Sequence, residues 1–249
     1  MTPLPTTTLL TLRIGTAGWS IPVQFQAAFP QYGTHLERYA SVFNAVEINT
    51  SFYRPHRLST YQRWAAAVPE SFRFAVKIPK EITHLRKLDD VAPLLDAFLT
   101  QVAGLGSKLG PLLVQLPPSL AFNGATVERF LGDLRARVTG AVAFEPRHPS
   151  WFAPDVDALL AAFRIARVAA DPSPVPQAAQ PAGWPGLTYF RLHGSPEMYY
   201  TPYSDQAIEA VFKTLIPRAH DGSACWCIFD NTASGAATGN ALTAGIMQG

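Results

Sequence analysis

Charged side chains are scarce in this sequence of 249 residues. The 20 Lys and Arg and the 18 Asp and Glu make up only 15% of it, against ~25% in typical soluble domains. The formal net charge of +2 is too small to indicate nucleic acid or an anionic membrane surface as a partner. Hydrophobic residues nevertheless form 48% of the chain and aromatic residues 11%. This composition excludes a disordered chain and allows a large buried core.

Cysteine is almost absent, and the two that occur, Cys225 and Cys227, stand two residues apart in an apolar run. A β-strand would hold their Cα atoms ~6.5 Å apart, which is the outer edge of disulfide geometry. We therefore predict two buried free thiols in a reducing compartment, with a redox or metal role as the alternative.

Long apolar runs are also missing, since none approaches the ~18 residues that a membrane span requires. Residues 1–8 contain no basic residue before Leu9 and Leu10, so the sequence predicts no signal peptide. We expect a cytoplasmic protein without a membrane partner. No Walker-type or dinucleotide-binding glycine motif occurs, and nothing in the sequence indicates an oligomeric state.

Short β-rich runs alternate with longer helical patterns along the chain, which is typical of successive βα units around a parallel sheet. The β-rich runs are 12–16, 45–49, 72–78, 111–116, 141–145, 165–170, 187–193 and 224–229. The helical patterns are 58–68, 91–105, 126–138, 155–163, 205–220 and a short one after Gly239. Eight repeats of ~31 residues each suit a strand, a helix and two loops. The sequence therefore predicts the α/β class and one (β/α)8 TIM-like barrel domain over residues 1–249.

Two segments depart from a minimal barrel, and both follow predicted strands. Residues 20–32 are aromatic and nearly uncharged. Residues 171–186 contain five prolines, too many for a regular helix. We expect this proline-rich loop to replace the sixth helix.

Alternation along the predicted strands sends polar side chains into the lumen at the carboxyl ends, where (β/α)8 enzymes build their active sites. In Ala45–Asn49, for example, Val46 and Ile48 must face the helices, so Glu47 points inward. The polar residues expected at this mouth are Glu47, Asn49, Lys77, Gln115, Glu145, Arg147, Asp171, Arg191, His193, Asp230 and Asn231. Burying such charges costs several kcal/mol each unless they are paired or serve a ligand. The alternatives are therefore a functional site and a self-neutralising ion-pair network that plugs the barrel.

Short motifs along nearly the whole chain resemble the YecE-like family, often described only as domain of unknown function seventy-two. The motifs are Gly15–Trp19, Glu47–Asn49, Ser51–Tyr53, Lys77–Pro79, Ile82–His84, Leu109–Pro111, Gln115–Pro118, Glu145–His148, Ser150–Trp151, Arg191–Gly194, Tyr200, Tyr203–Ser204, Asp230–Thr232 and Asn240–Ala241. The resemblance implies a (β/α)8 barrel and supports the site, but it brings no settled activity. Family members commonly carry Phe in place of Pro146, and a paired Asn in place of Asp230.

The charges at the mouth indicate the chemistry. Lys77, Arg147 and Arg191 would clamp a phosphate, sulfate or carboxylate, so a small anionic ligand, such as a phosphorylated one, is the first expectation. Glu145 is the leading acid/base group and Glu47 the second, with His193 or His148 assisting proton transfer. We expect an enzyme of the hydrolase or lyase type. Sugar hydrolysis by the two glutamates and a Schiff base on Lys77 remain alternatives.

A metal-dependent phosphodiester hydrolase similar to endonuclease IV-like barrels is a further alternative. Its ligands for a divalent metal would come from His84, His148, His193, Glu47, Glu145 and Asp171. Three cations among these side chains compete with a metal for the carboxylates, so we predict no cofactor. Nucleic-acid binding and a non-catalytic ligand sensor also stay open.

Aromatic side chains follow several predicted strands, and they would either stack on a base or sugar or cover the rim of the barrel. They include Phe52, Tyr53, Trp151, Tyr199, Tyr200 and Tyr203. The complete set of expected ligand contacts is Asn49, Phe52, Tyr53, His84, Gln115, Arg147, Trp151, Asp171, Arg191, Tyr200, Tyr203, Asp230 and Asn231.

Overall fold

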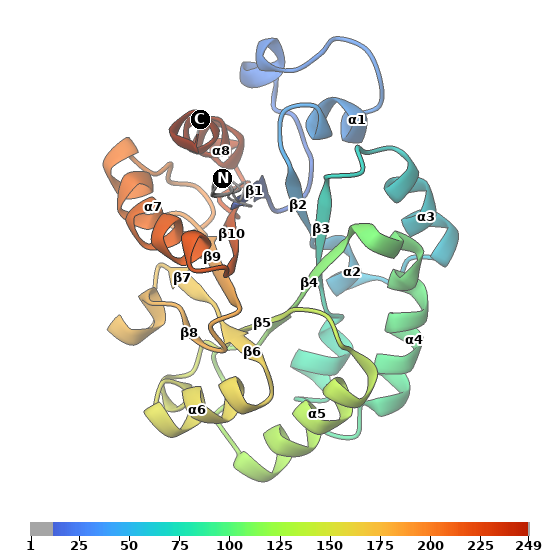
Figure 1. The fold of residues 1–249 in the computed structure, drawn as a ribbon, viewed down its shortest axis with the longest axis vertical. Coiled ribbons are helices and arrows are strands. Elements are labelled where there is room, and N and C mark those ends of the chain that lie inside the picture. The colour runs from blue at the N-terminus through green and yellow to red at the C-terminus, as the bar shows by residue number, and fades with distance from the viewer. Residues whose placement is uncertain (1–11, 249) are drawn as a thin grey trace, which may run out of the picture.

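The computed structural model describes residues 12–248, and each of the eight β-rich runs contains a strand (Figure 1). The strands are β1 (Leu12–Thr16), β2 (Ala45–Ile48), β3 (Arg73–Lys77), β4 (Leu109–Gln115), β5 (Val142–Glu145), β6 (Ile165–Arg167), β7 (Ala169–Asp171), β8 (Ala182–Gly183), β9 (Leu187–Leu192) and β10 (Ala224–Phe229). The sixth run is divided at Val168 into β6 and β7, which belong to different sheets. The sequence did not predict β8.

The strands form two sheets, with the orders β1-β10-β9-β7 and β2-β3-β4-β5-β6-β8. Every pair is parallel except β6 and β8. At one junction a single parallel bridge joins Ala17 to Glu47. The predicted α/β class with parallel strands is confirmed, whereas the hydrogen-bonded ladders do not form the one closed sheet that the barrel prediction requires.

The helices lie outside the strands (Figure 1). The α-helices are α1 (His35–Ala40), α2 (Thr50–Tyr53), α3 (Leu58–Ala66), α4 (Ala92–Val102), α5 (Gly124–Arg137), α6 (Pro154–Ala162), α7 (Asp205–His220) and α8 (Ala236–Gln248). Helix α7 has the bounds that the sequence predicted. Helix α1 was not predicted, although Thr34 and Glu37 form a capping box at its start, each accepting from the backbone N–H of the other.

Short turns of other helical types connect the larger elements. They are the 3-10 helices η1 (Val23–Ala28), η3 (Ala103–Lys108), η4 (Pro149–Trp151) and η5 (Pro176–Ala179) and the π-helix η2 (Glu81–Leu85). Between β7 and β9 the described chain holds only η5 and β8. The proline-rich segment thus contains no α-helix, as the sequence predicted.

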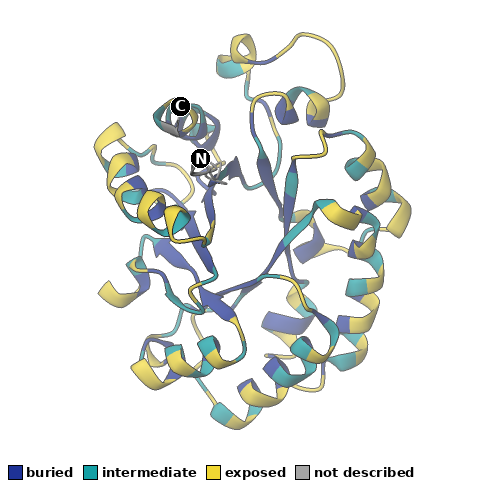
Figure 2. Ribbon diagram, in the orientation of Figure 1, coloured by how far each residue is buried: buried dark blue, intermediate teal, exposed yellow. Residues whose placement is uncertain are grey.

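Buried side chains form two separate cores. The outer core fills the space between strands and helices, and Figure 2 shows buried strands surrounded by helices with exposed outer faces. The inner core draws side chains from strands of both sheets: Ala45, Ala75, Leu113, Ala143, Ala166, Val168, Ala170, Leu187, Tyr189, Trp226 and Ile228. Leu113, Ala143 and Tyr189 are members of this inner core and not of the outer one. On β2, β3 and β5 the inner core holds an alanine, and a charged residue follows two positions later at the carboxyl end of each strand.

Several smaller predictions are also decided by the structure. Cys225 and Cys227 are buried and free, as predicted. Among the described helices, none is long and apolar enough to cross a membrane. Residues 1–11, for which the sequence predicts no signal peptide, and residue 249 lie outside the described chain.

The close approach of β1 to β2 depends on Gly15, and this generates a stability test. A Cβ atom at Gly15 would lie 2.1 Å from the backbone oxygen of Ala45. We expect Gly15→Ala to lower the free energy of unfolding by about 3 kcal/mol, because the backbone of β1 or β2 must move to make room for the added methyl group. Gly132→Ala is the control, since a Cβ there meets nothing within 4 Å inside α5 and should stabilise by about 1 kcal/mol. Equal effects in urea denaturation would contradict this account.

Candidate functional site

A cluster of charged side chains occupies the carboxyl ends of the strands. It is formed by Glu47 (β2), Lys77 (β3), Glu145 (β5), Arg147, Arg191 (β9), His193 and Asp230. Glu47, Glu145, Arg191 and His193 are fully buried. The structure thus brings together side chains that are far apart in the sequence, as the strand pattern predicted. We call these seven residues the central cluster.

Arg191 is the centre of this cluster and binds three carboxylates. Its Nη2 and Nε donate to the two oxygens of Glu47 at 2.6 and 3.0 Å, and its Nη1 donates to Glu145 Oε2 at 2.6 Å. A further bond runs from Nη2 to Asp230 Oδ2 at 2.9 Å. Burial opposes the charge of Arg191, but the three carboxylates raise its pKa well above the ordinary value. Four of the five guanidinium N–H groups are engaged, so Arg191 mainly holds the carboxylates in place.

His193 lies between two of these carboxylates. Its Nδ1 is 3.0 Å from Asp230 Oδ2, and its Nε2 is 3.1 Å from Glu145 Oε1 and 2.7 Å from Arg147 Nη2. A neutral imidazole can donate from Nδ1 to Asp230 and accept from Arg147 at Nε2. A protonated one can donate from Nε2 to Glu145. Nε2 therefore has one partner that suits its protonated form, Glu145, and one that suits its unprotonated form, Arg147.

The carboxylates around His193 are held in their ionised form. Burial would raise the pKa of Glu145, but Arg191, Arg147 and His193 together hold it well below its ordinary value. The pKa of Asp230 is lowered too, because Arg191 and the hydrogen bond to His193 outweigh burial. An ionised carboxylate can accept a proton but cannot donate one. The expected acid/base role of Glu145 therefore stays a prediction, and its surroundings favour an orienting role, because a carboxylate with so low a pKa is also a weak base.

Lys77 differs from the other cations of the cluster. It is 8% exposed, and its Nζ lies 4.2 Å from the centroid of the Phe52 ring. Within residues 12–248 the Nζ has no hydrogen bond and no ion pair closer than 4.0 Å. Burial and the positive charge of Arg191 lower the pKa of Lys77 to about 8, despite the opposing effect of Glu47, Glu145 and Asp230. A largely buried ammonium without an ion pair carries a cost of desolvation.

Two further residues belong to the segments that follow β3 and β2. The ring of His84 packs edge-on against Phe52 at 4.9 Å, and burial and Lys77 lower its pKa. The Oδ1 atom of Asn49, just beyond β2, is buried without a hydrogen-bond partner in the described chain. Phe52, His84 and Asn49 were all expected as ligand contacts, and that expectation stays a prediction.

Other predicted site residues belong to a separate network. The hydroxyl of Tyr203 donates to Asp171 Oδ2 at 2.6 Å, and Asn231 Nδ2 donates to Asn240 Oδ1 at 2.9 Å. Asn240 Oδ1 in turn accepts from the backbone N–H of Tyr203 at 3.0 Å. These bonds tie the segment after β9 to helix α8 and to the end of β7. The visible role of Asp171, Tyr203 and Asn231 is therefore to hold loops in place.

The remaining expected contacts lie in different surroundings. Trp151 is 0% exposed, donates from Nε1 to Leu120 and packs in the outer core, so it does not face the mouth. His148 caps η4 by accepting from Ser150 instead of contacting the central cluster. Gln115 lies beside Glu145 in the register of β4 and β5. Tyr53 and Tyr200 are 70% and 53% exposed.

Tyr199 contacts the central cluster at His193, although the set of expected ligand contacts does not include it. Its ring packs edge-on against His193 at 6.0 Å, and its backbone N–H donates to the His193 oxygen at 2.5 Å. Its φ of 71° lies in the left-handed region that a non-glycine residue rarely adopts. Sequence reasoning could place Tyr199 among the rim aromatics, but it could not distinguish Tyr199 from Tyr200.

A model of the family described as "Protein of unknown function DUF72" matches residues 13–245. The UPF0759 protein YecE of Escherichia coli (strain K12) is 33% identical over 141 residues, which cover 56% of this chain and 50% of YecE. The UPF0759 protein YunF of Bacillus subtilis (strain 168) is 28% identical over 153 residues, which cover 57% and 52%. The chain thus spans about half the length of the curated relatives it matches.

Solved structures show the same fold. A DUF72 family protein from Enterococcus faecalis V583 matches with a TM-score of 0.80 and 23% identity over 95% of each chain. A DUF72 family protein from Thermotoga maritima MSB8 matches with a TM-score of 0.78 and 24% identity over 95% of this chain and 98% of that one. The resemblance found in the sequence motifs is therefore confirmed.

The unpaired charge of Lys77 generates a test of stability. Its pKa is about 8 in the folded chain against an ordinary 10.5, so the charged form opposes folding below pH 8. Between pH 8 and 10.5 only the unfolded chain binds the proton, and stability should rise with pH. We expect Lys77→Met to raise the free energy of unfolding at pH 7 by up to about 3 kcal/mol and to remove this rise.

Lys213→Met, on the exposed face of α7, is the matched control and should change neither quantity. Urea denaturation from pH 7 to 10.5 measures both. A destabilised Lys77→Met variant would show that the ammonium is already compensated within the fold.

Proposed function

Because this chain belongs to the family described as protein of unknown function DUF72, we propose its activity from the site itself: it binds a small anionic ligand at Lys77 and transfers a proton at His193. The proposed enzyme is a (β/α)8-type barrel domain with its active site at the carboxyl ends of the strands. The ligand class we favour is a phosphorylated sugar or a nucleotide. The unpaired buried ammonium of Lys77 is the observation that carries the proposal.

The three carboxylates and three cations of the central cluster balance formally, and the support for an anionic ligand comes from how these charges are paired. Its carboxylates are Glu47, Glu145 and Asp230, and its cations are Lys77, Arg147 and Arg191. The ion pairs use Arg147 and Arg191, which leaves Lys77 as the cation without a paired carboxylate among residues 12–248. A bound anion would pair with this remaining cation.

The bonds around His193 fit general acid–base work. Asp230 fixes the imidazole through Nδ1, so that Nε2 is the atom that exchanges the proton. Glu145 can accept a hydrogen bond from a protonated Nε2, and Arg147 can donate one to an unprotonated Nε2. The pKa of Lys77, about 8, also allows its side chain to donate a proton as the ammonium or accept one as the neutral amine near neutral pH. The neutral fraction of this amine is what a Schiff base with a carbonyl ligand would require.

Asp230 distinguishes the site of this chain from the site that the family resemblance implies. The family resemblance implies Asn at this position, whereas here a carboxylate binds both Arg191 and His193. An Asp–His pair stabilises an imidazolium better than an Asn–His pair does. We propose that this substitution strengthens proton transfer by His193.

The metal-dependent alternative finds less support in the side chains. Across residues 12–248 no group of three or more His, Cys, Asp and Glu side chains could hold a metal ion. His84 and His148 point to partners outside the central cluster, at Thr83 and Ser150. The proposal therefore routes no step through a metal.

Binding and turnover test the proposal in one experiment. The purified protein is screened by thermal shift against phosphorylated sugars and nucleotides, and any ligand found is assayed for turnover. A ligand at ~100 times its Kd adds ~2.7 kcal/mol, which raises the Tm by roughly 5–10 °C. We expect Lys77→Met to abolish this shift and Lys213→Met to keep it. His193→Gln should keep the shift but lower turnover by ~10²–10⁴-fold.

Each part of the proposal can fail separately. A shift that survives in Lys77→Met would place the ligand elsewhere. Turnover that survives in His193→Gln would remove the assigned proton carrier. Tight binding without turnover by the unaltered protein would make the chain a ligand sensor instead of an enzyme.

A further inference from the structure

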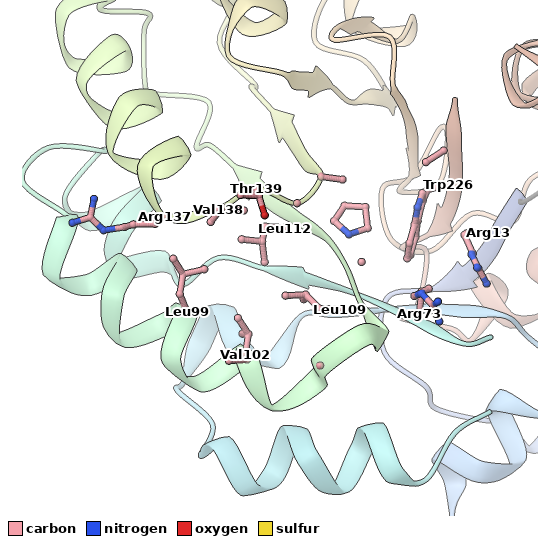
Figure 3. Close-up of a pocket in the computed structure, with 17 residues that line it drawn as sticks. Arg13, Arg73, Leu99, Val102, Leu109, Leu112, Arg137, Val138, Thr139 and Trp226 are labelled. Atoms are coloured by element: carbon pink, nitrogen blue, oxygen red, sulfur yellow. The ribbon is translucent and has the colours of Figure 1, made fainter. Parts of the chain in front are cut away.

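A cavity of about 570 Å³ lies at the opposite end of the strands from the central cluster (Figure 3). Residues at or near the starts of β1, β3, β4 and β10 line it, including Arg13, Arg73, Leu109 and Ala224. Its size is within the ~300–1,000 Å³ of sites that hold small molecules. None of the proposed catalytic or ligand-binding residues lines it. We call it the amino-end cavity.

Two arginines face this cavity side by side (Figure 3). Arg13 donates from Nη1 to the backbone oxygens of Ser71 at 2.6 Å and Asn44 at 3.4 Å. Arg73 donates from Nη1 to the backbone oxygens of Glu70 at 2.6 Å and Phe72 at 2.9 Å. Both guanidinium groups are therefore anchored by one nitrogen. Their Nε and Nη2 atoms have no hydrogen bond to any described residue.

The charges of these two arginines are not balanced by the protein. Neither forms an ion pair with a described carboxylate, and the residues lining the cavity include no Asp or Glu. Burial and the nearby charge of Arg73 lower the pKa of Arg13, which shows that the two cations repel each other. Arg137, at the other end of the cavity, is already paired with Asp96 and Asp133. One end of the cavity therefore carries two positive charges that no described carboxylate balances.

The rest of the wall is largely apolar. Leu99, Val102 and Leu109 line one side, and the indole of Trp226 stands beside the arginines (Figure 3). Trp226 stacks on Tyr189 with ring centroids 5.8 Å apart and planes at 9°. A Cβ atom at Gly110 would come within 2.7 Å of the indole, so the glycine lets this ring lie close to β4. The cavity therefore joins a doubly charged end to an apolar body.

We propose that the amino-end cavity is a second ligand site, which binds a phosphate monoester with an apolar or aromatic body. A phosphate monoester carries a charge of about −1.5 to −2 at pH 7, which matches two unpaired guanidinium groups better than a single carboxylate does. Arginine presents N–H groups in a planar fork that suits phosphate oxygens. The apolar wall would hold the esterified group. Nucleoside monophosphates belong to this class.

Phenyl phosphate is a suitable probe, because it combines the dianion with a small aromatic body. Binding to the full chain is measured by titration calorimetry, with inorganic phosphate and phenol as partial probes. We expect phenyl phosphate to bind at least tenfold more tightly than either. In a Lys77→Met background, which removes the proposed anion-binding group of the central cluster, Arg13→Met and Arg73→Met should each weaken its binding at least tenfold, whereas Lys213→Met should leave it unchanged. Arg13→Lys keeps the charge but loses the fork, and should give an intermediate loss.

Several results would overturn the proposal. Absence of binding, or inorganic phosphate binding as tightly as phenyl phosphate, would show that the cavity does not select a phosphate ester. Loss of binding in the Lys77→Met background itself would assign the probe to the central cluster. The two sites are thus tested independently, since each is altered by its own cation.

Discussion

The bond network of Arg191 with three buried carboxylates is the interaction on which the candidate site depends. One guanidinium binds Glu47 from β2, Glu145 from β5 and Asp230 after β10. These residues belong to both sheets, so the network ties the two sheets together at their carboxyl ends. Buried ion pairs seldom stabilise a fold better than well-packed apolar side chains would. Their use here is to fix charged groups around His193.

The same network explains why Lys77 remains available. The carboxylates are held by Arg191 and Arg147, and the ammonium packs on Phe52 without an ion pair within residues 12–248. The three carboxylates and three cations of the cluster balance formally, as in a self-neutralising network, but Lys77 forms none of the ion pairs among the described residues. The site is thus assembled at a cost in stability that a bound anion would offset. Both ends of the strands carry unpaired cations, but a stacked pair, Tyr189 and Trp226, lies between them.

The sequence predicted best where the backbone is regular. Alternation along the strands placed Glu47, Lys77, Glu145 and Arg191 in one lumen, and the structure joins them there. Beyond the strand ends no such rule applies. Trp151 therefore packs in the outer core and His148 caps a turn, although both were expected at the ligand. The contact of Tyr199 with His193 depends on a left-handed backbone that no residue pattern revealed.

The pKa of Lys77 tests the central claim most directly. It can be measured by NMR titration of the labelled lysine side chain in the unaltered protein and in Glu145→Gln. The account predicts a pKa of about 8, and a still lower value in Glu145→Gln, since the carboxylate of Glu145 supports the charge of the ammonium. An ordinary pKa near 10.5 that does not respond to Glu145 would contradict the account, because Lys77 would then be solvated and not available as a buried anion site.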